Sequence, residues 1–161
     1  MRLGVMSDTH NHLANTRQIV ALLNDARVDR VVHTGDITQA KTLEVLAGLE
    51  APLFGVYGNN DLQREALEAT CRAHGHRFVD PPLRLEWHGR RIVVVHDPTH
   101  LNVALLLEVD VALHGHDHAH TDEQRHGARV FNPGECAGHM RGYNQVGVLD
   151  LETLAAEILR F

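Results

Sequence analysis

The sequence predicts an α/β protein in which two β-sheets pack together and helices cover their outer faces. Strand-like apolar segments alternate with amphipathic helical segments in the first half of the chain, which is typical of a parallel sheet. In the second half, short strand-like segments flank His-Gly turns, which indicates hairpins. A length of 161 residues with 43% hydrophobic and 22% charged residues suits one domain with a sizeable core. We therefore expect a single domain over residues 1–161.

Three strand-and-helix units make up the first half. The expected elements are, in order, a strand at Arg2 to Ser7, a helix at Thr16 to Asp25, a strand at Arg30 to His33, a helix at Thr42 to Leu49, a strand at Pro52 to Tyr57 and a helix at Leu62 to His74. The first helix has apolar residues at helical spacing, at Ile19, Leu22 and Leu23. Because successive strands joined by helices run parallel, these units imply a parallel sheet.

The pattern changes after Pro81 and Pro82. The expected elements are strands at Leu83 to Trp87 and Arg91 to Val95 around the turn His88-Gly89, a helix at Thr99 to Glu108, a strand at Val111 to Leu113, a hairpin over Gln124 to Phe131 around His126-Gly127, and a closing hairpin of Gln145 to Leu151 with Ala155 to Phe161. Since hairpins join antiparallel strands, we expect this half to form a mixed or antiparallel sheet.

Composition and charge exclude several classes of protein. The formal charge of −6 has the wrong sign for a protein that binds nucleic acid through its phosphates. The longest apolar runs, Ile19 to Leu23 and Val103 to Leu107, fall far short of the roughly 18 residues that span a bilayer. No signal peptide is evident, so we expect a cytoplasmic protein without membrane contact. Ser7 is the only serine and Gly-rich nucleotide motifs are absent, which argues against serine hydrolases and nucleotide-dependent enzymes.

Histidine is unusually abundant, with 14 copies, and neutral imidazole is the commonest metal ligand. Several histidines belong to five polar clusters that each follow an expected strand directly. The clusters are Asp8-Thr9-His10, Gly35-Asp36, Gly58-Asn59-Asn60-Asp61, His96, and His114-Gly115-His116-Asp117-His118. Open α/β sheets build their sites at the carboxyl ends of strands. We therefore expect these clusters to meet in a metal site.

Spacing within the clusters favours chelation. In D-x-H and H-x-H, ligands at i and i+2 point to the same side of an extended backbone, and glycines beside Asp36, Asn59 and His116 allow tight turns. The predicted ligands are Asp8, His10, Asp36, Asn59, His96, His116 and His118. With one bridging carboxylate, these side chains supply enough bonds for two ions. Two divalent ions and two aspartates leave a charge of about +2, which suits an anionic phosphate ester.

Nitrogen and oxygen ligands without thiolate argue against a structural zinc of the Cys type and allow manganese, iron, nickel, cobalt or catalytic zinc, of which manganese is our first expectation. In this order, the motifs D-x-H, G-D, G-N-x-D, a lone histidine and G-H-x-H resemble those of the calcineurin-like metallophosphoesterases over the whole chain. The chain is most similar to the small bacterial and archaeal metal-dependent phosphodiesterases, which also carry an N-P-G loop, here Asn132-Pro133-Gly134. The resemblance implies a four-layer α/β/β/α sandwich of two mixed sheets.

The resemblance also implies how the ligands are shared. One metal would take Asp8, His10, Asp36 and His118, and the other Asp36, Asn59, His96 and His116, with Asp36 as the catalytic bridge. The implied reaction is hydrolysis of a small phosphoester, preferably a diester, by attack of a metal-bridging hydroxide. Relatives often have a histidine that protonates the leaving group where this chain has Asn60, and a glycine where it has Asp97. Asn60 is predicted to contact a phosphoryl oxygen instead, and activated leaving groups are favoured.

Other residues are interpreted more conservatively. His33 is expected to pack beside its strand, Cys136 to be an inert thiol and Arg141 to lie at the surface. Four histidines are candidates either for groups that support the metal ligands or for a substitute acid: His12, His114, His120 and His139. A phosphomonoesterase, or a non-catalytic scaffold on the same fold, as in the retromer subunit that resembles these enzymes, remains an alternative. The oligomeric state, a homo-oligomer included, stays open.

Overall fold

The computed structural model describes residues 1–139 and 142–161, so the expectation for Arg141 lies outside the described residues. Among the described residues there are four α-helices, a short 3-10 helix and eleven strands. In chain order they are β1 (Arg2–Met6), α1 (Leu13–Asp25), β2 (Arg30–His33), α2 (Ala40–Leu46), β3 (Leu53–Val56), α3 (Arg64–His74), β4 (Arg77–Val79), β5 (Leu83–Trp87), β6 (Arg90–Val94), η1 (Pro98–His100), α4 (Val103–Leu107), β7 (Val111–Leu113), β8 (Thr121–Arg125), β9 (Ala128–Asn132), β10 (Gln145–Asp150) and β11 (Ala156–Arg160).

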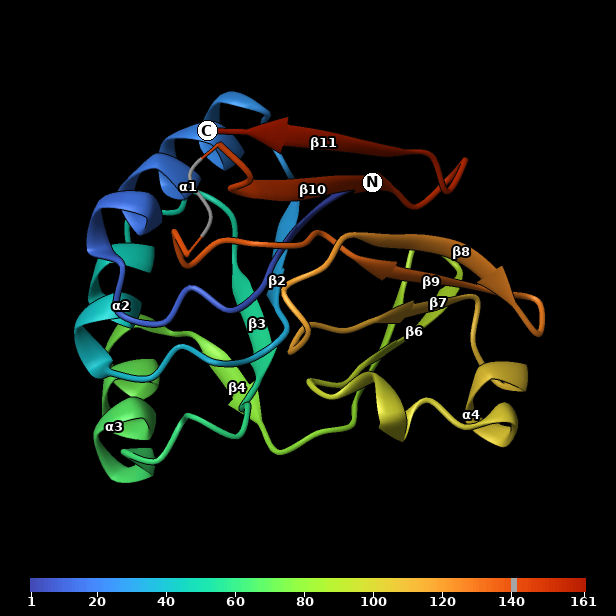
Figure 1. Cartoon of the computed structure of the whole chain (residues 1–161), viewed down its shortest axis with the longest axis horizontal. Helices are drawn as coiled ribbons and strands as arrows, with labels where there is room; N and C mark the ends of the chain where they lie inside the picture. Colours follow the sequence, from blue (N-terminus) through green and yellow to red (C-terminus); the bar gives the residue numbers. More distant parts are fainter. Residues whose placement is uncertain (140–141) are drawn as a thin grey trace.

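The strands form two mixed sheets, as predicted (Figure 1). The first has the order β11-β10-β1-β2-β3-β4, in which β1 to β4 run parallel and β10 and β11 are antiparallel additions. The second has the order β5-β6-β7-β9-β8, with β6, β7 and β9 parallel and an antiparallel strand at each edge. The closing hairpin therefore belongs to the first sheet, where β10 pairs with β1, and not to the sheet of the second half as expected, so the first sheet is mixed rather than purely parallel.

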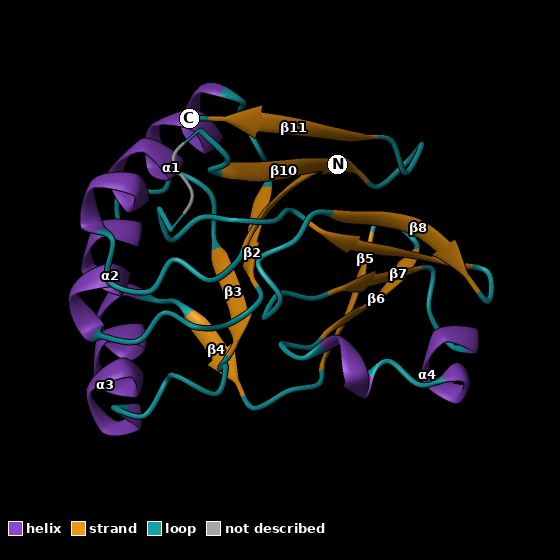
Figure 2. Cartoon of the chain, viewed as in Figure 1, coloured by secondary structure: helices purple, strands orange, loops and turns teal. Residues whose placement is uncertain are grey.

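Three apolar layers hold the molecule together. The two sheets lie between helices α1 to α3 on one side and α4 on the other, which confirms the four-layer sandwich (Figure 2). The layer between the helices α1 to α3 and the first sheet includes Ile19, Leu43 and Leu67. Between the two sheets, side chains such as Val5 and Phe131 interlock, and a smaller layer lies between the second sheet and α4. Burial of apolar area in all three layers is the main stabilising contribution to the fold.

Several predicted boundaries are wrong, for identifiable reasons. The helix expected from Thr99 to Glu108 is interrupted because Asn102 has extended backbone angles and its side chain accepts a hydrogen bond from Leu105 N–H at 2.9 Å, which starts α4 afresh. Strands β4 and β8 were not predicted at their observed positions. β4 has only three residues, and β8 is polar throughout and exposed apart from its half-buried first residue, without an apolar alternation. Pairing with β3 and β9 stabilises them.

The topology positions the five polar clusters. They follow β1, β2 and β3 in the first sheet and β6 and β7 in the second. These strands are parallel within each sheet, so their carboxyl ends lie along one edge of each sheet, as predicted. Within the described part of the chain, the helices are too short or too polar to cross a lipid bilayer.

A tight contact between the sheets yields the first prediction. A Cβ on Gly147 of β10 would stand 2.5 Å from the ring of the buried Phe131. Gly147→Ala is therefore expected to lower the free energy of unfolding by about 1 to 3 kcal/mol through overpacking, measured by urea denaturation. Adding Phe131→Leu should recover part of the loss. Equal stability of Gly147→Ala and the natural chain would contradict this account.

Candidate metal centre

The loops that carry the predicted ligands are tightly coiled rather than extended. Positive φ angles occur at Asp8 (52°), His10 (43°), Asp36 (61°), His116 (76°) and His118 (55°). The expectation that D-x-H and H-x-H present their ligands from an extended backbone is therefore wrong, although the ligands do converge. Non-glycine residues rarely adopt such angles, and each costs on the order of 1 to 3 kcal/mol. Strain of this kind persists only where surrounding interactions enforce it.

Asp61 supplies much of that enforcement. Its buried carboxylate accepts backbone N–H groups from Asp36 at 3.0 Å, from Thr38 at 2.5 Å and from Gly58 at 2.7 Å. These bonds tie the loop after β2 to the loop after β3. Burial raises the pKa of Asp61, while the backbone hydrogen bonds oppose that rise. The sequence analysis placed Asp61 in a cluster but assigned it no role, because its partners are backbone groups.

Two glycines are required by close approach rather than by a turn. A Cβ on Gly58 would stand 2.2 Å from Asp36 Oδ1, and a Cβ on Gly115 would stand 1.8 Å from Ser7 Oγ. Neither glycine has a positive φ, whereas Gly35 does, at 113°. The predicted tight turn therefore applies to Gly35, and the other two let neighbouring loops pack against the ligands.

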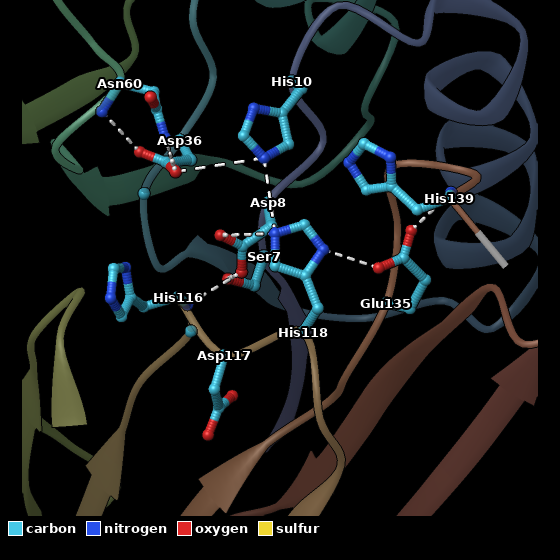
Figure 3. Close-up of polar contacts among 12 residues, drawn as sticks. Ser7, Asp8, His10, Asp36, Asn60, His116, Asp117, His118, Glu135 and His139 are labelled. Carbon is cyan, nitrogen blue, oxygen red and sulfur yellow. Dashed lines mark hydrogen bonds and ion pairs between the residues drawn. The ribbon is translucent and has the colours of Figure 1, made fainter.

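The first group of donors contains an unpaired buried oxygen. Asp8 Oδ2 accepts the Ser7 hydroxyl and, at 3.0 Å, the His116 N–H, whereas the buried Asp8 Oδ1 has no hydrogen-bond partner among the described residues. His118 Nε2 lies 3.7 Å from Oδ1, and His10 Nε2 lies 3.4 Å from His118 Nε2 (Figure 3). A buried carboxylate oxygen without a donor is costly, and a cation among these atoms would satisfy it.

The imidazole of His118 directs its Nε2 toward this group. Its Nδ1–H donates to Glu135 Oε2 at 2.6 Å, so in the neutral ring Nε2 carries a lone pair. Glu135 is buried and also accepts the backbone N–H of His139 at 2.8 Å through Oε1. A carboxylate behind a histidine ligand fixes its tautomer and raises its basicity. Sequence reasoning missed Glu135, although it follows the Asn132-Pro133-Gly134 loop directly.

The second group of donors surrounds His96. Its Nδ1–H donates to the Thr34 carbonyl at 3.0 Å, so Nε2 faces the site, with a lone pair in the neutral ring and a proton to donate to Asp36 in the charged ring. That nitrogen lies 3.0 Å from Asn59 Oδ1, 3.3 Å from His116 Nδ1 and 3.5 Å from Asp36 Oδ1. Burial lowers the pKa of His96, but the hydrogen bond and charge of Asp36 raise it above its usual value. The site therefore stabilises a positive charge at this point.

Asp36 lies between the two groups. Its Oδ1 faces His96, and its Oδ2 lies 3.9 Å from His10 Nε2. Asn60 donates its backbone N–H to Oδ1 at 2.9 Å and its side-chain amide to Oδ2 at 2.6 Å. Burial raises the pKa of Asp36, but hydrogen bonds from His96 and Asn60 hold it well below the usual range. Asn60 thus positions the carboxylate, and its predicted substrate contact stays a prediction.

All seven predicted ligands converge on this edge, and the donor chemistry fits divalent cations. Of the four other candidate histidines, His139 faces the ligands: its ring centroid lies 5.2 Å from that of His118 and 5.8 Å from that of His10. The other three hydrogen-bond to backbone groups. His12 caps the N-terminus of α1, and the rings of His114 and His120 hydrogen-bond to backbone carbonyls.

Buried groups outside the ligand set behave as expected. Burial lowers the pKa of His33 to about 3, and its Nε2 hydrogen-bonds the Thr9 hydroxyl, so His33 is a neutral structural residue. The pKa of the Cys136 thiol is raised, chiefly by burial, to about 12. A protonated thiol is a poor ligand and nucleophile.

Together, the four-layer sandwich and the clustered nitrogen and oxygen donors define a metal-dependent hydrolase with an α/β fold. The chain belongs to the calcineurin-like phosphoesterase superfamily, whose profile matches residues 1–154. It is a phosphoesterase, and the resemblance drawn from the motifs is confirmed.

Known proteins support this placement at two levels. The chain is 31% identical over 156 residues to the phosphodiesterase MJ0936 of Methanocaldococcus jannaschii, covering 94% of each chain. A solved structure described as a novel archaeal phosphodiesterase has a TM-score of 0.91 and 30% identity, with both chains covered completely. Yfce, a phosphoesterase from E. coli, has a TM-score of 0.74 and 22% identity, covering 99% of this chain and 98% of its own. That likeness shows the fold alone.

The hydrogen bonds by which Asp61 joins the loops after β2 and β3 can be tested by an isosteric substitution. Asp61→Asn is expected to lower the free energy of unfolding by about 1 to 3 kcal/mol, because the new amide would face backbone donors that need acceptors. Asp29→Asn is the matched control, since Asp29 accepts one backbone N–H, from Arg2, at an exposed position. Urea denaturation of both variants without metal gives the comparison. Equal, small losses would contradict the special role of Asp61.

The carboxylate behind His118 can be tested by metal binding. Glu135→Gln is expected to weaken divalent metal affinity about 10- to 100-fold, because a neutral amide supports the imidazole less well. Isothermal titration calorimetry with Mn²⁺ measures the effect. Glu123→Gln on the exposed strand β8 is the control. An affinity for Glu135→Gln equal to that of the control would show that Glu135 does not support the ligand.

Proposed function

We propose that the protein is a binuclear metal-dependent phosphodiesterase that hydrolyses small phosphate diesters. The observation that carries the proposal is the position of Asp36 between two groups of donors that face inward. In the proposed assignment, Asp8, His10, Asp36 and His118 hold one cation, and Asp36, Asn59, His96 and His116 hold the other. Manganese is the first expectation, with iron, nickel, cobalt or zinc as alternatives, since the donors are nitrogen and oxygen.

When bound, two divalent cations would supply an activated water as hydroxide nucleophile and positive charge that stabilises the phosphoryl group. The protein's own groups set the conditions for that chemistry. Two ligand carboxylates, Asp8 and Asp36, offset only part of a total charge of about +4, which leaves the site attractive to an anionic ester. The bonds from Asn60 to Asp36 and from Glu135 to His118 hold the donors in place, so that little reorganisation is needed.

Two cavities support a diester over a monoester. One, of about 310 Å³, is lined by three members of the second donor group, Asn59, His96 and His116, and by residues such as Tyr57 and His100. The other, of about 570 Å³, is lined by His118, Glu135 and His139 beside the first donor group. A phosphodiester carries two organic substituents, and a cavity at each side of the donors offers a place for both. The relatives named as phosphodiesterases agree with this preference.

The residue after Asn59 influences which leaving groups are suitable. The Asn60 side chain is an amide that donates to Asp36, and an amide is no proton source for a departing alkoxide. A positioned acid contributes typically about 10² to 10⁴ in rate. We therefore propose that diesters with activated leaving groups are hydrolysed fastest.

The proposal is tested with protein reconstituted separately with Mn²⁺, Ni²⁺, Fe²⁺ and Zn²⁺. Bis(4-nitrophenyl) phosphate is expected to be hydrolysed faster than 4-nitrophenyl phosphate in at least one metal form. Asp36→Asn should reduce that turnover by at least about 100-fold, because the variant loses the shared negative donor. Release of 4-nitrophenolate gives the rates.

Asp25→Asn, at the exposed end of α1, is the matched control and should leave turnover unchanged. Faster hydrolysis of the monoester would favour a phosphomonoesterase. Inactivity in all four metal forms would contradict a catalytic function and favour the scaffold alternative.

A further inference from the structure

We propose that His139 is an additional ligand of the first cation, so that this position is held by three imidazoles rather than two. The inference rests on the proposed metal centre and adds a residue that the motif pattern does not include. His139 lies in the loop between β9 and β10, far along the chain from His10. Its role would increase the chemical difference between the two metal positions.

The geometry supports ligation directly. One ring nitrogen from each of His10, His118 and His139 lies within 4.8 Å of the others. His118 is nearly stacked on His10, whereas His139 is edge-on to His10 (Figure 3). Nitrogen ligands stand about 2.0 to 2.1 Å from zinc, so pairs of ligand atoms on one ion are at most about 4.2 Å apart. The three nitrogens would need to approach one another by at most about 0.6 Å to meet this limit.

Hydrogen bonds fix the backbone of the residues just before His139. Gly138 N–H donates to Asn144 Oδ1 at 3.0 Å, and Asn15 Nδ2 donates to the Cys136 carbonyl at 2.9 Å. Gly138 has φ of 76°, and a Cβ there would stand 3.0 Å from the His12 ring. Helix α1 and the loop are therefore packed closely at this point.

Glu135 couples His139 to an existing ligand. One carboxylate oxygen accepts the His118 Nδ1–H at 2.6 Å, and the other accepts the His139 backbone N–H at 2.8 Å. The buried Glu135 carboxylate thus fixes both the ring orientation of His118 and the backbone position of His139. Such shared support is what a preorganised ligand set requires.

The chemical consequence is a difference in metal preference. With His139, the first group offers three imidazoles and two carboxylates, whereas the second offers two imidazoles, one carboxylate and one amide. Imidazole favours zinc, nickel, cobalt and iron, while oxygen donors suit manganese. The first position should therefore discriminate more strongly for zinc over manganese than the second does.

The experiment compares Zn²⁺ and Mn²⁺ binding to the natural chain, His139→Ala and a control by isothermal titration calorimetry. His139→Ala is expected to weaken one Zn²⁺ site by about tenfold or more and Mn²⁺ binding by less. The control is His126→Asn, which removes an exposed imidazole from the β8–β9 turn at a positive φ that asparagine tolerates. It should leave both affinities unchanged.

A crystal structure of the natural chain with Zn²⁺ gives a second readout that does not depend on the variant folding. An anomalous zinc peak with a His139 nitrogen at about 2.0 to 2.1 Å is expected. Unchanged Zn²⁺ affinity in His139→Ala, or a zinc ion in the first group without His139 among its ligands, would overturn the inference while leaving the metal centre intact. Absence of any divalent binding to the natural chain would overturn the proposed function as well.

Discussion

The carboxylate of Asp36 must face two groups of electron-rich atoms at once, and the rest of the site is arranged around that requirement. Unpaired oxygens and imidazole lone pairs repel one another at short range unless positive charge lies between them. Here they are held together by backbone hydrogen bonds to Asp61, by Asn60 and by Glu135. Asp8 Oδ1, which is buried without a hydrogen-bond partner among the described residues, is an atom that needs such positive charge nearby.

A rigid scaffold is needed to hold such an arrangement. Five residues with positive φ bear donors, and their strain must be offset by burial elsewhere. The three apolar layers provide this, because they pack two sheets and four helices, within the described chain, behind the ligand loops. Donors from both sheets contribute to the second group, as Asn59 follows β3 and His96 follows β6. Packing between the sheets therefore determines whether that group forms.

The elements and the predicted ligands were largely predictable from sequence, because the succession of strands along the chain and the spacing within each motif are local signals. The clusters after β1, β2, β3, β6 and β7 identified every proposed ligand of the family pattern, and their convergence follows from parallel strands. Backbone conformation and partners distant in sequence were not predictable. Asp61 acts on backbone N–H groups, Glu135 reaches His118 across 17 positions, and β8 is polar because an edge strand needs pairing more than burial.

The pairing of β1 with β10 bears on how the protein is made. β1 lies inside the first sheet, with β2 on one side and β10 on the other, yet β10 emerges from the ribosome only after residues 145–150 are translated. One edge of β1 thus stays unpaired until β10 has been made, and the loop bearing Glu135, which leads into β10, cannot take its final position before then. An unpaired strand edge can pair with other chains, so the free edge of β1 exposes the nascent chain to aggregation until β10 docks.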